Sequence, residues 1–192
     1  MISSKDIKAL ASVTKNLVTD QTFSHIHKKL NTAVTAFNGS LGFGAADANS
    51  SAVFVDGGGF NDQRMTAVMR FVSPTVAASC SLGAFIRCQT LDTNPSYYWA
   101  RVDGGVARIT KVLSGTFSTL SSNTFALPQN EDVTITFSAV GTVLSASFVS
   151  ASGSAATVNL VATDSSIAGT GLMGFRSLVS SIYCTSFTAE QL

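Results

Sequence analysis

From residue 37 onward the chain consists of short stretches in which apolar and polar residues alternate. The stretches recur roughly every ten residues and are separated by Gly, Asn, Asp and Ser, which favour turns. Alternation places successive side chains on opposite faces of a strand, so the pattern predicts an all-β, antiparallel sandwich or barrel. We expect strands at 51–55, 65–72, 79–89, 97–102, 106–113, 133–140, 143–149, 157–161, 172–176 and 181–188.

The breaks between these stretches have a chemical basis. Asp103-Gly104-Gly105 can supply the positive φ of a tight hairpin, and Val140-Gly141-Thr142 predicts a bend between two strands. Ser73-Pro74 and Asn94-Pro95 block strand continuation. Because no linker divides the region, we expect one sandwich domain at 37–192, a size that suits a single core.

The first 36 residues follow a different pattern and are predicted to form a helical N-terminal arm (1–36). One amphipathic helix is expected from Ser3 or Ser4 to Val18, and a weaker one from Asp20 or Thr22 to Val34, where an extended strand is the alternative. Such an arm can dock on a partner subunit or close the bottom of its own sandwich. The apolar face of the first helix would hold Ile7, Leu10, Ala11, Thr14, Leu17 and Val18.

Charge and hydropathy limit the classes of partner. Only 12% of the 192 residues are charged and the net charge is +1, so neither nucleic acid nor an anionic membrane is an expected partner. No apolar run approaches the roughly twenty residues of a membrane span. Lys5, Asp6, Lys8 and Lys15 interrupt the N-terminus, which indicates no secretion signal.

The three cysteines favour free, buried thiols in a reducing compartment. Cys80 and Cys88 lie on one predicted strand, where eight residues of about 3.3 Å each keep them beyond bridging distance. A pairing of Cys184 with either of them stays open.

The stretch from Ala78 to Leu113 carries the candidate site. Its alternation predicts that Leu82, Ile86, Tyr98 and Ile109 are buried, while arginines and aromatics share the opposite face. Arg beside Trp and Tyr suits stacking on sugar rings and fork-like hydrogen bonds. The alternative is a solvated or interface face with cation–π contacts. The candidate ligand-binding residues are Arg70, Arg87, Tyr97, Trp99, Arg101 and Arg108.

The order of these strands resembles the concanavalin A-like lectin/glucanase superfamily, in particular its laminin-G-like members. The resemblance covers roughly residues 37 to 190, and the arm lies outside it. It implies a jelly roll of two curved antiparallel sheets that serves sugar binding, adhesion or structure. The residues that carry it are 82–87, 97–102, 106–113, Gly115, Leu120, 133–146, Asp164, Gly169, 171–176 and 187–188.

Catalytic and metal chemistry find little support. Glycan-cleaving members of that superfamily carry paired acids on one strand, whereas Glu131 and Glu190 are the only glutamates here and lie in a turn and beside the C-terminus. His25 and His27 have no Cys or carboxylate cluster nearby. We therefore expect no enzyme, no metal and no cofactor. Turn chemistry accounts better than calcium for the loop oxygens of Asp47, Asn49, Asp56, Asn61, Asp62 and Asp164.

These observations together favour a non-enzymatic structural and binding protein. The low charge, the Ser, Thr, Ala and Gly content and the arm suit a virion component, such as a phage capsid decoration protein or fibre, made in the host cytoplasm. The arm would contact other structural subunits in a homo-oligomer, with a glycan as an additional ligand. The alternatives are an independent carbohydrate-binding module and a glycan-active enzyme.

Overall fold

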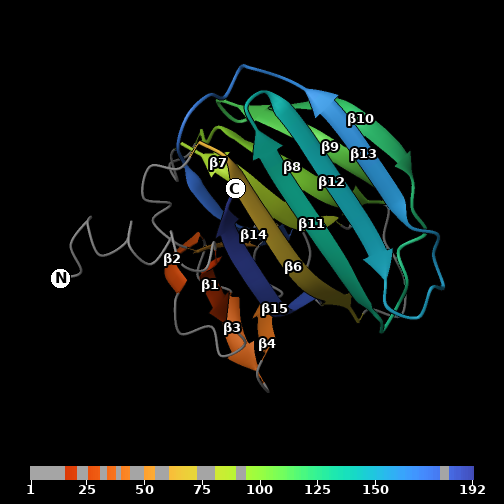
Figure 1. The fold of residues 1–192 in the computed structure, drawn as a ribbon. Helices are drawn as coiled ribbons and strands as arrows, with labels where there is room; N and C mark the ends of the chain where they lie inside the picture. The colour runs from red at the N-terminus through yellow and green to blue at the C-terminus, as the bar shows by residue number, and fades with distance from the viewer. Residues whose placement is uncertain are drawn as a thin grey trace.

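A computed structural model describes the backbone of five short N-terminal strands and most of the remaining chain. The regular structure within these ranges consists of fifteen strands in two antiparallel sheets that pack face to face (Figure 1). None of the described residues forms a helix with the length and apolar character needed to cross a membrane. The described residues are 16–20, 26–30, 34–37, 40–43, 50–54, 61–72, 81–89, 94–177 and 182–192.

Sheet A faces the viewer in Figure 1 and contains eight strands. The short strand β1 (Asn16–Asp20) pairs with one end of the long C-terminal strand β15, and β4 pairs with the other. Across the sheet the order is β13 (Val158–Thr163), β12 (Val143–Ser150), β11 (Asp132–Val140), β6 (Gln63–Phe71), β15 (Ile182–Gln191), β4 (Ser40–Phe43) and β3 (Val34–Phe37).

Sheet B lies behind sheet A in that view and contains seven strands. Its order is β10 (Thr116–Thr124), β9 (Val106–Leu113), β8 (Tyr97–Asp103), β7 (Ser81–Cys88), β14 (Leu172–Ser177), β5 (Ser50–Phe54) and β2 (Ile26–Leu30).

The core lies between the two sheets and follows from the alternation of the sequence. Every second residue of β6 and β11 is buried, and the intervening residues are partly exposed. Leu82, Ile86, Tyr98 and Ile109 enter this core from sheet B with no exposed area, as predicted. Each fully buried large apolar side chain contributes about 2 kcal/mol, so this layer dominates the stability of the sandwich.

The predicted all-β antiparallel sandwich is confirmed, and β9 has the predicted bounds. The predicted hairpins are confirmed as well, since Gly104, Gly105 and Gly141 have φ values of 55°, 86° and 55°. Strand β10 was not predicted. Apart from Phe117 and Leu120 its residues are polar, and it forms the edge of sheet B, so it lacks the alternation that marks a half-buried strand.

Within the helix expected from Asp20 or Thr22 to Val34, residues 26–30 form strand β2, which is the extended alternative, and Val34 begins β3; residues 21–25 and 31–33 lie outside the described residues. Strand β2 pairs with β5, and β3 pairs with β4, so sheet edges supply the hydrogen-bond partners that a weak local helix preference would otherwise provide internally. Most of the first predicted helix lies outside the described residues, and its last residues belong to β1. The division at residue 36 stays a prediction.

Cys184 is a free thiol in the core, as expected, and burial raises its pKa well above the ordinary value. Cys88 lies on the other side of sheet B, in a separate apolar cluster. Cys80 lies outside the described residues.

Candidate functional site

The outer face of sheet B, which points away from the core, carries Tyr97, Trp99 and Arg101 on β8. Pairing between strands aligns Trp99 with Phe85 of β7 and Arg101 with Arg108 of β9. Alternation therefore places these three residues of β8 as the sequence predicted. Together with Phe117 and Arg176 they form the Arg–aromatic cluster: Phe85, Tyr97, Trp99, Phe117, Arg101, Arg108 and Arg176.

Four aromatic rings form a chain through this cluster. Ring centroids are 5.4 Å apart for Phe85 and Tyr97, 6.4 Å for Tyr97 and Trp99, and 6.4 Å for Trp99 and Phe117. Trp99 has no exposed area, whereas Phe117 is 46% exposed. The ring that a ligand can reach is therefore Phe117 on the edge strand β10, and Trp99 forms the floor beneath it.

Two guanidinium groups lie over that floor. The Cζ atoms of Arg101 and Arg176 are 4.9 and 5.3 Å from the centroid of Trp99, and each lies within 6 Å of the centroid of Phe117. Arg176 also donates a hydrogen bond to the hydroxyl of Tyr97. Cation–π contact with Trp99 thus holds the arginines in place.

Arg101 is fixed from several sides. Its Nε donates to Thr110 at 3.2 Å and its Nη1 to Ser81 at 3.2 Å, while Nη2 lies 3.1 Å from the Asp103 carboxylate. Arg108 approaches the same carboxylate at 3.7 Å. Burial lowers the pKa of Arg101. The carboxylate of Asp103 raises this pKa, and the guanidinium groups of Arg108 and Arg176 lower it.

Arg87 does not lie on this face, and its predicted place in the binding surface is wrong. Its φ of 53° and a register shift between β7 and β14 form a bulge that reverses the alternation after Ile86. The outer position therefore goes to Cys88, which packs in the same apolar cluster as Tyr97. The cause is local backbone geometry that alternation does not encode.

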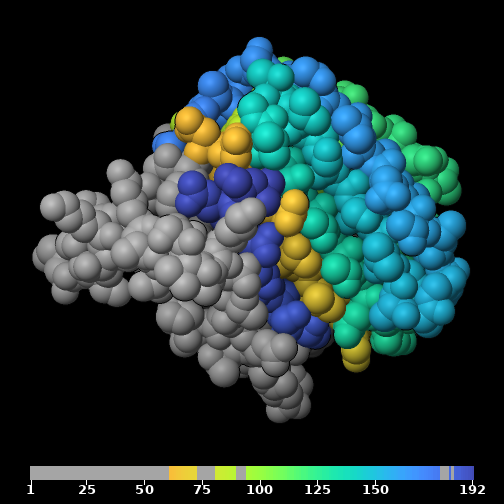
Figure 2. Space-filling model, viewed as in Figure 1, coloured from red at the N-terminus to blue at the C-terminus, as the bar shows by residue number. Residues whose placement is uncertain are grey.

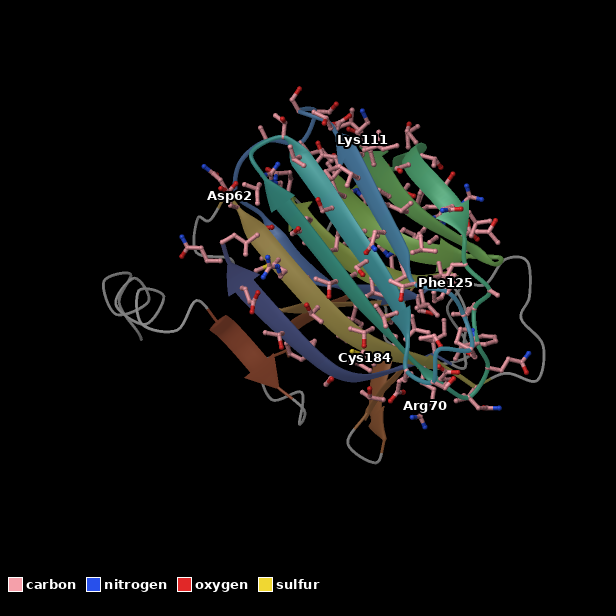
Figure 3. All side chains as sticks on the ribbon, turned by 45° about the vertical axis from the view of Figure 1, so that its right-hand side comes forward. Asp62, Arg70, Lys111, Phe125 and Cys184 are labelled. Atoms are coloured by element: carbon pink, nitrogen blue, oxygen red, sulfur yellow. The ribbon has the colours of Figure 1, made fainter. Side chains whose placement is uncertain are left out.

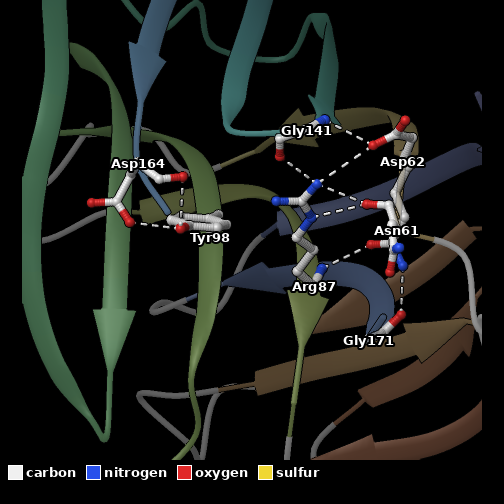
Figure 4. A network of polar contacts seen from close by, with 8 residues as sticks. Asn61, Asp62, Arg87, Tyr98, Gly141, Asp164 and Gly171 are labelled. Atoms are coloured by element: carbon white, nitrogen blue, oxygen red, sulfur yellow. Dashed lines mark hydrogen bonds and ion pairs between the residues drawn. The ribbon is translucent and has the colours of Figure 1, made fainter. Parts of the chain in front are cut away.

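The Arg87 side chain forms a clamp at one end of the sandwich (Figure 4). Its Nε and Nη2 donate to the carbonyl of Asn61 at 3.0 and 2.8 Å, and Nη2 also donates to the carbonyl of Gly141 at 2.7 Å. The carboxylate of Asp62 lies 3.7 Å from Nη2 of Arg87 and accepts a hydrogen bond from the Gly141 amide at 2.8 Å. The clamp joins the start of β6 to the β11–β12 turn.

The buried Gln63 amide completes this network. Its Oε1 accepts a hydrogen bond from the backbone of Arg87 at 2.9 Å, and its Nε2 donates to the Gly171 carbonyl at 2.7 Å. A Cβ on Gly171 would lie 2.5 Å from the backbone carbon of Arg87, so only glycine fits there. Arg87 is therefore held by contacts within the fold.

Arg70 is also outside the cluster, and its predicted place on the same face is wrong. It lies on β6 in sheet A, whose neighbours are β11 and β15, and pairs with Asp132 at 2.7 Å. Figure 3 shows Arg70 at the end of the sandwich opposite Asp62. The expected neighbourhood with β7 does not exist because β6 and β7 belong to different sheets.

Sequence reasoning missed Phe117, Arg176 and Asp103. Phe117 lies on the unpredicted strand β10. Arg176 was assigned to a strand, but its approach to Trp99 depends on the pairing of β14 with β7, whose paired residues are 84 to 95 positions apart in the sequence, and no local pattern shows such a pairing. Asp103 and Arg108 lie on the two strands of the predicted β8–β9 hairpin and form an ion pair at 3.7 Å. The register of that hairpin was therefore the one sequence signal that could have identified Asp103.

Two acidic residues outside the cluster, Glu131 and Asp164, lie in loops and are held by hydrogen bonds. Glu131 accepts hydrogen bonds from the Ser150 hydroxyl, the Ser152 amide and the Ser154 hydroxyl, which lower its pKa to about 2. Burial raises the pKa of Asp164, but hydrogen bonds from Lys111 and Tyr98 outweigh this and hold it well below the ordinary range.

Within the described residues, no group of three or more His, Cys, Asp or Glu side chains could hold a metal ion. Asp62 accepts a hydrogen bond from the Gly141 amide, and Asp164 accepts one from the Ser166 amide, both at 2.8 Å. Asp47, Asn49 and Asp56 lie outside the described part of the chain.

Neither a family model nor a curated protein sequence matches this chain. Solved structures match over most of its length. The carbohydrate binding module CBM66 from Bacillus subtilis has a TM-score of 0.65 and 15% identity, with 85% of this chain and 94% of that chain covered. The Lotus tetragonolobus seed lectin has a TM-score of 0.61 and 7% identity, with 90% and 96% covered.

A third similar structure is the CBM2 module of the evolved Dit of Lactobacillus casei BL23 phage J-1. It has a TM-score of 0.58 and 12% identity, and 92% of this chain and 95% of that chain are covered. These likenesses show that the chain has the jelly-roll fold of the concanavalin A-like lectin superfamily, as the sequence resemblance implied.

Proposed function

We propose that this protein binds carbohydrate on the outer face of sheet B. The observation that carries the proposal is the juxtaposition of exposed Phe117 with the guanidinium groups of Arg101 and Arg176 on a lectin-type jelly roll, with Arg108 directly opposite Arg101 on the next strand. A sugar ring presents apolar C–H groups on one face and hydroxyl groups at its rim. An aromatic ring beside fixed donors matches both features.

Each part of the cluster has a distinct role in this proposal. Phe117 provides the stacking surface, and Arg101 and Arg108 donate hydrogen bonds to ring oxygens and hydroxyls. Trp99 does not contact the ligand, because it is fully buried; it positions Arg101 through cation–π contact. Preorganised donors limit the entropy lost on binding, which favours affinity from a small contact area.

The acids support binding without catalysis. Retaining hydrolysis needs two carboxyl groups about 5 Å apart, one of them protonated to act as the general acid. Glu131 is held as a carboxylate by three donors, and Glu190 is paired with Arg64 at 3.2 Å on sheet A. We therefore propose a non-catalytic role. Release of reducing sugar ends from any bound polysaccharide would contradict it.

A glycan array followed by calorimetry tests the binding site. Phe117→Ala should weaken binding of a glycan hit by about fivefold or more, because one stacking contact is worth about 1 kcal/mol or more. The control is Val161→Ala, which removes a 63% exposed apolar side chain from sheet A and should leave affinity unchanged. Equal affinity of both variants and the native protein would place the glycan elsewhere.

A second candidate is that this binding domain belongs to a phage or other viral particle. The similarity to a module of a phage Dit protein supports it, as do the low charge and the Ser- and Thr-rich composition. In this proposal the protein is a homo-oligomeric virion component whose N-terminal residues contact other structural subunits. Light scattering should show an oligomer, and immunogold microscopy should label particles from the source organism. A monomer with label confined to cells would refute it.

A further inference from the structure

We infer that a pocket at one end of the sandwich binds a single neutral sugar residue, apart from the Arg–aromatic cluster. The pocket has a volume of about 350 Å³ and lies between the β7–β8 connection, the β9–β10 turn and the β13–β14 connection. Two amide side chains, three serine hydroxyls and three apolar side chains line it, and no charged side chain is among these described residues. The inference goes beyond the proposed function and does not depend on it.

Hydrogen bonds tie the first two walls of the pocket together. The amide of Ser114 in the β9–β10 turn donates to Oγ of Ser96 at 2.9 Å, and the amide of Gly115 donates to the carbonyl of Pro95 at 3.0 Å. The backbone amide of Gln89 donates to the carbonyl of Ser96 at 2.9 Å, across the β7–β8 connection. The turn and the connection therefore hold one another in a fixed position.

The third wall, the β13–β14 connection, is fixed by side chains of β8 and β9. Nζ of Lys111 donates to the hydroxyl of Ser166 at 2.9 Å and to the carboxylate of Asp164 at 2.8 Å. The hydroxyl of Tyr98 accepts a hydrogen bond from the Ile167 amide at 3.0 Å. Walls that are fixed before binding reduce the entropy lost when a ligand enters.

The three serine hydroxyls supply hydrogen-bond donors to the pocket. The oxygens of Ser96 and Ser166 accept from the Ser114 amide and from Lys111, so their hydroxyl protons remain available for a ligand. The hydroxyl of Ser114 makes no hydrogen bond within the described part of the chain. Three donors from three different segments therefore meet in one pocket.

Gln89 supplies an acceptor beside these donors. Its Nε2 donates to the carbonyls of Arg87 and Thr170 at 3.2 and 2.8 Å, which fixes the amide plane and leaves Oε1 for a ligand. A sugar hydroxyl both donates and accepts, whereas an ammonium group only donates and a carboxylate only accepts. The combination of donors and an acceptor therefore matches a polyhydroxylated ligand.

The apolar part of the lining, the size and the lack of charge narrow the ligand further. The 43% exposed side chain of Leu113 offers an apolar surface to the C–H face of a sugar ring. Small-molecule sites span about 300 to 1,000 Å³, so a pocket of about 350 Å³ suits one ring rather than a long chain. A charged ligand would lose hydration without gaining a counter-charge from the lining, so we expect a neutral sugar.

A second groove, of about 460 Å³, crosses the outer face of sheet A, the face turned toward the viewer in Figure 2. Its lining includes the ion pair of Arg64 and Glu190 at 3.2 Å. The hydroxyls of Thr66 and Thr136, which also line it, bond to each other at 3.3 Å. Because this groove is charged and part of its hydroxyl groups are used, the pocket is the better match for a neutral sugar.

Nuclear magnetic resonance of the full chain tests the pocket. The probes are the methyl α- and β-glycosides of glucose, galactose and mannose, each compared with the glycoside of the corresponding uronate. At least one neutral glycoside should shift the backbone amide signals of Ser114, Ser166 and Ile167, with a dissociation constant on the order of 1 mM. The uronate should bind at least tenfold more weakly, because its carboxylate would be desolvated without a partner.

Ser114→Gly removes one hydroxyl without endangering the fold. Ser114 has a φ of 48°, which glycine adopts without strain, so the variant should be at least as stable to urea as the native protein. Its affinity for the neutral glycoside should fall by about fivefold, as expected for one hydrogen bond. Asn130→Gly is the matched control: it changes a residue with a φ of 55° that does not line the pocket, and it should leave affinity unchanged.

The outcomes separate this pocket from the cluster. If no neutral glycoside shifts the three pocket amides, or if the uronate binds as tightly, the inference is wrong. Shifts confined to Phe117 and Arg108 would overturn it and support the proposed function at the cluster. Native affinity in Ser114→Gly would also refute it. Conversely, an unchanged glycan affinity in Phe117→Ala would reject the cluster and leave the pocket standing.

Discussion

The indole of Trp99 occupies the space above Gly83 on the neighbouring strand. A Cβ added to Gly83 would lie 2.7 Å from Nε1 of Trp99, and 2.0 Å from the backbone carbonyl oxygen of Ala100. The floor of the Arg–aromatic cluster therefore depends on the absence of a single methyl group. Trp99 in turn carries Arg101 and Arg176, so one glycine on β7 sets the position of two charges.

Gly83→Ala should destabilise the protein by about 3 kcal/mol, because the clash involves backbone that cannot move without opening the β7–β8 pairing. Urea unfolding measures the loss. Gly153→Ala is the control: its Cβ would meet nothing within 4 Å, so only the strain of its φ of 75° remains, about 1 kcal/mol. Equal losses in the two variants would show that the space above Gly83 is not restrictive.

Arg87→Met should cost about 3 kcal/mol of stability, because the carbonyls of Asn61 and Gly141 lose buried donors. Arg64→Met is the matched control. It breaks an ion pair whose arginine side chain is 43% exposed, so the expected loss is below about 1 kcal/mol. Chemical unfolding of both variants measures the difference. A loss at position 87 no greater than at position 64 would contradict the clamp.

Tyr98→Phe should lower the free energy of unfolding by about 2 kcal/mol. The Tyr98 hydroxyl donates a hydrogen bond to Asp164 at 2.6 Å and accepts one from the Ile167 amide at 3.0 Å, and the variant loses both. Burial, together with the bond to Asp164, raises the pKa of Tyr98 to about 12. Its contribution is therefore complete below the unfolded pKa of about 10 and is lost as the pH rises toward 12. Stability measured from pH 9 to 12 should fall less in Tyr98→Phe than in the native protein. Parallel curves would contradict this assignment.

The hydrogen bonds of Glu131 should make the stability of the protein depend on pH in the acid range. Three donors lower its pKa to about 2, so its contribution is present above the unfolded pKa of about 4.3 and is lost as the pH falls toward 2. Urea unfolding between pH 5 and pH 2 should show a smaller decline in Glu131→Gln than in the native protein. Glu190→Gln provides the control for the loss of one glutamate charge. If Glu131→Gln declines as steeply as the native protein, the loop of Ser150 to Ser154 does not depend on this carboxylate.

Much of the fold could be predicted because one period dominates the sequence. The alternation of Val106 to Leu113 fixes both the bounds of β9 and the face of each residue, and the glycines at 104 and 105 fix its hairpin to β8. The strand at Thr116 to Thr124 could not be found in this way. It is an edge strand with Ser and Thr on both faces. Because few of its side chains are buried, its sequence shows no regular alternation of apolar and polar residues.

The candidate site was only partly predictable, for two physical reasons. A bulge at Arg87 shifts the alternation by one position, and a positive φ at an arginine has no sequence signature. The second reason is that sheet membership depends on distant pairing. Arg70 and Arg176 lie on strands of equal local character, yet only the strand of Arg176 joins β7. Tyr97, Trp99, Arg101 and Arg108 were placed correctly because one continuous meander carries them.

The clamp around Arg87 has a consequence for the time course of folding. It joins segments that are 24, 54 and 108 positions apart along the chain, through Gln63, Gly141 and Gly171. Contacts between such distant segments can stabilise the chain only after both sheets have formed. We therefore expect the clamp to be absent from the folding transition state. Removing it should accelerate unfolding and leave the folding rate almost unchanged. Arg87 would then determine how long the native sandwich persists once formed.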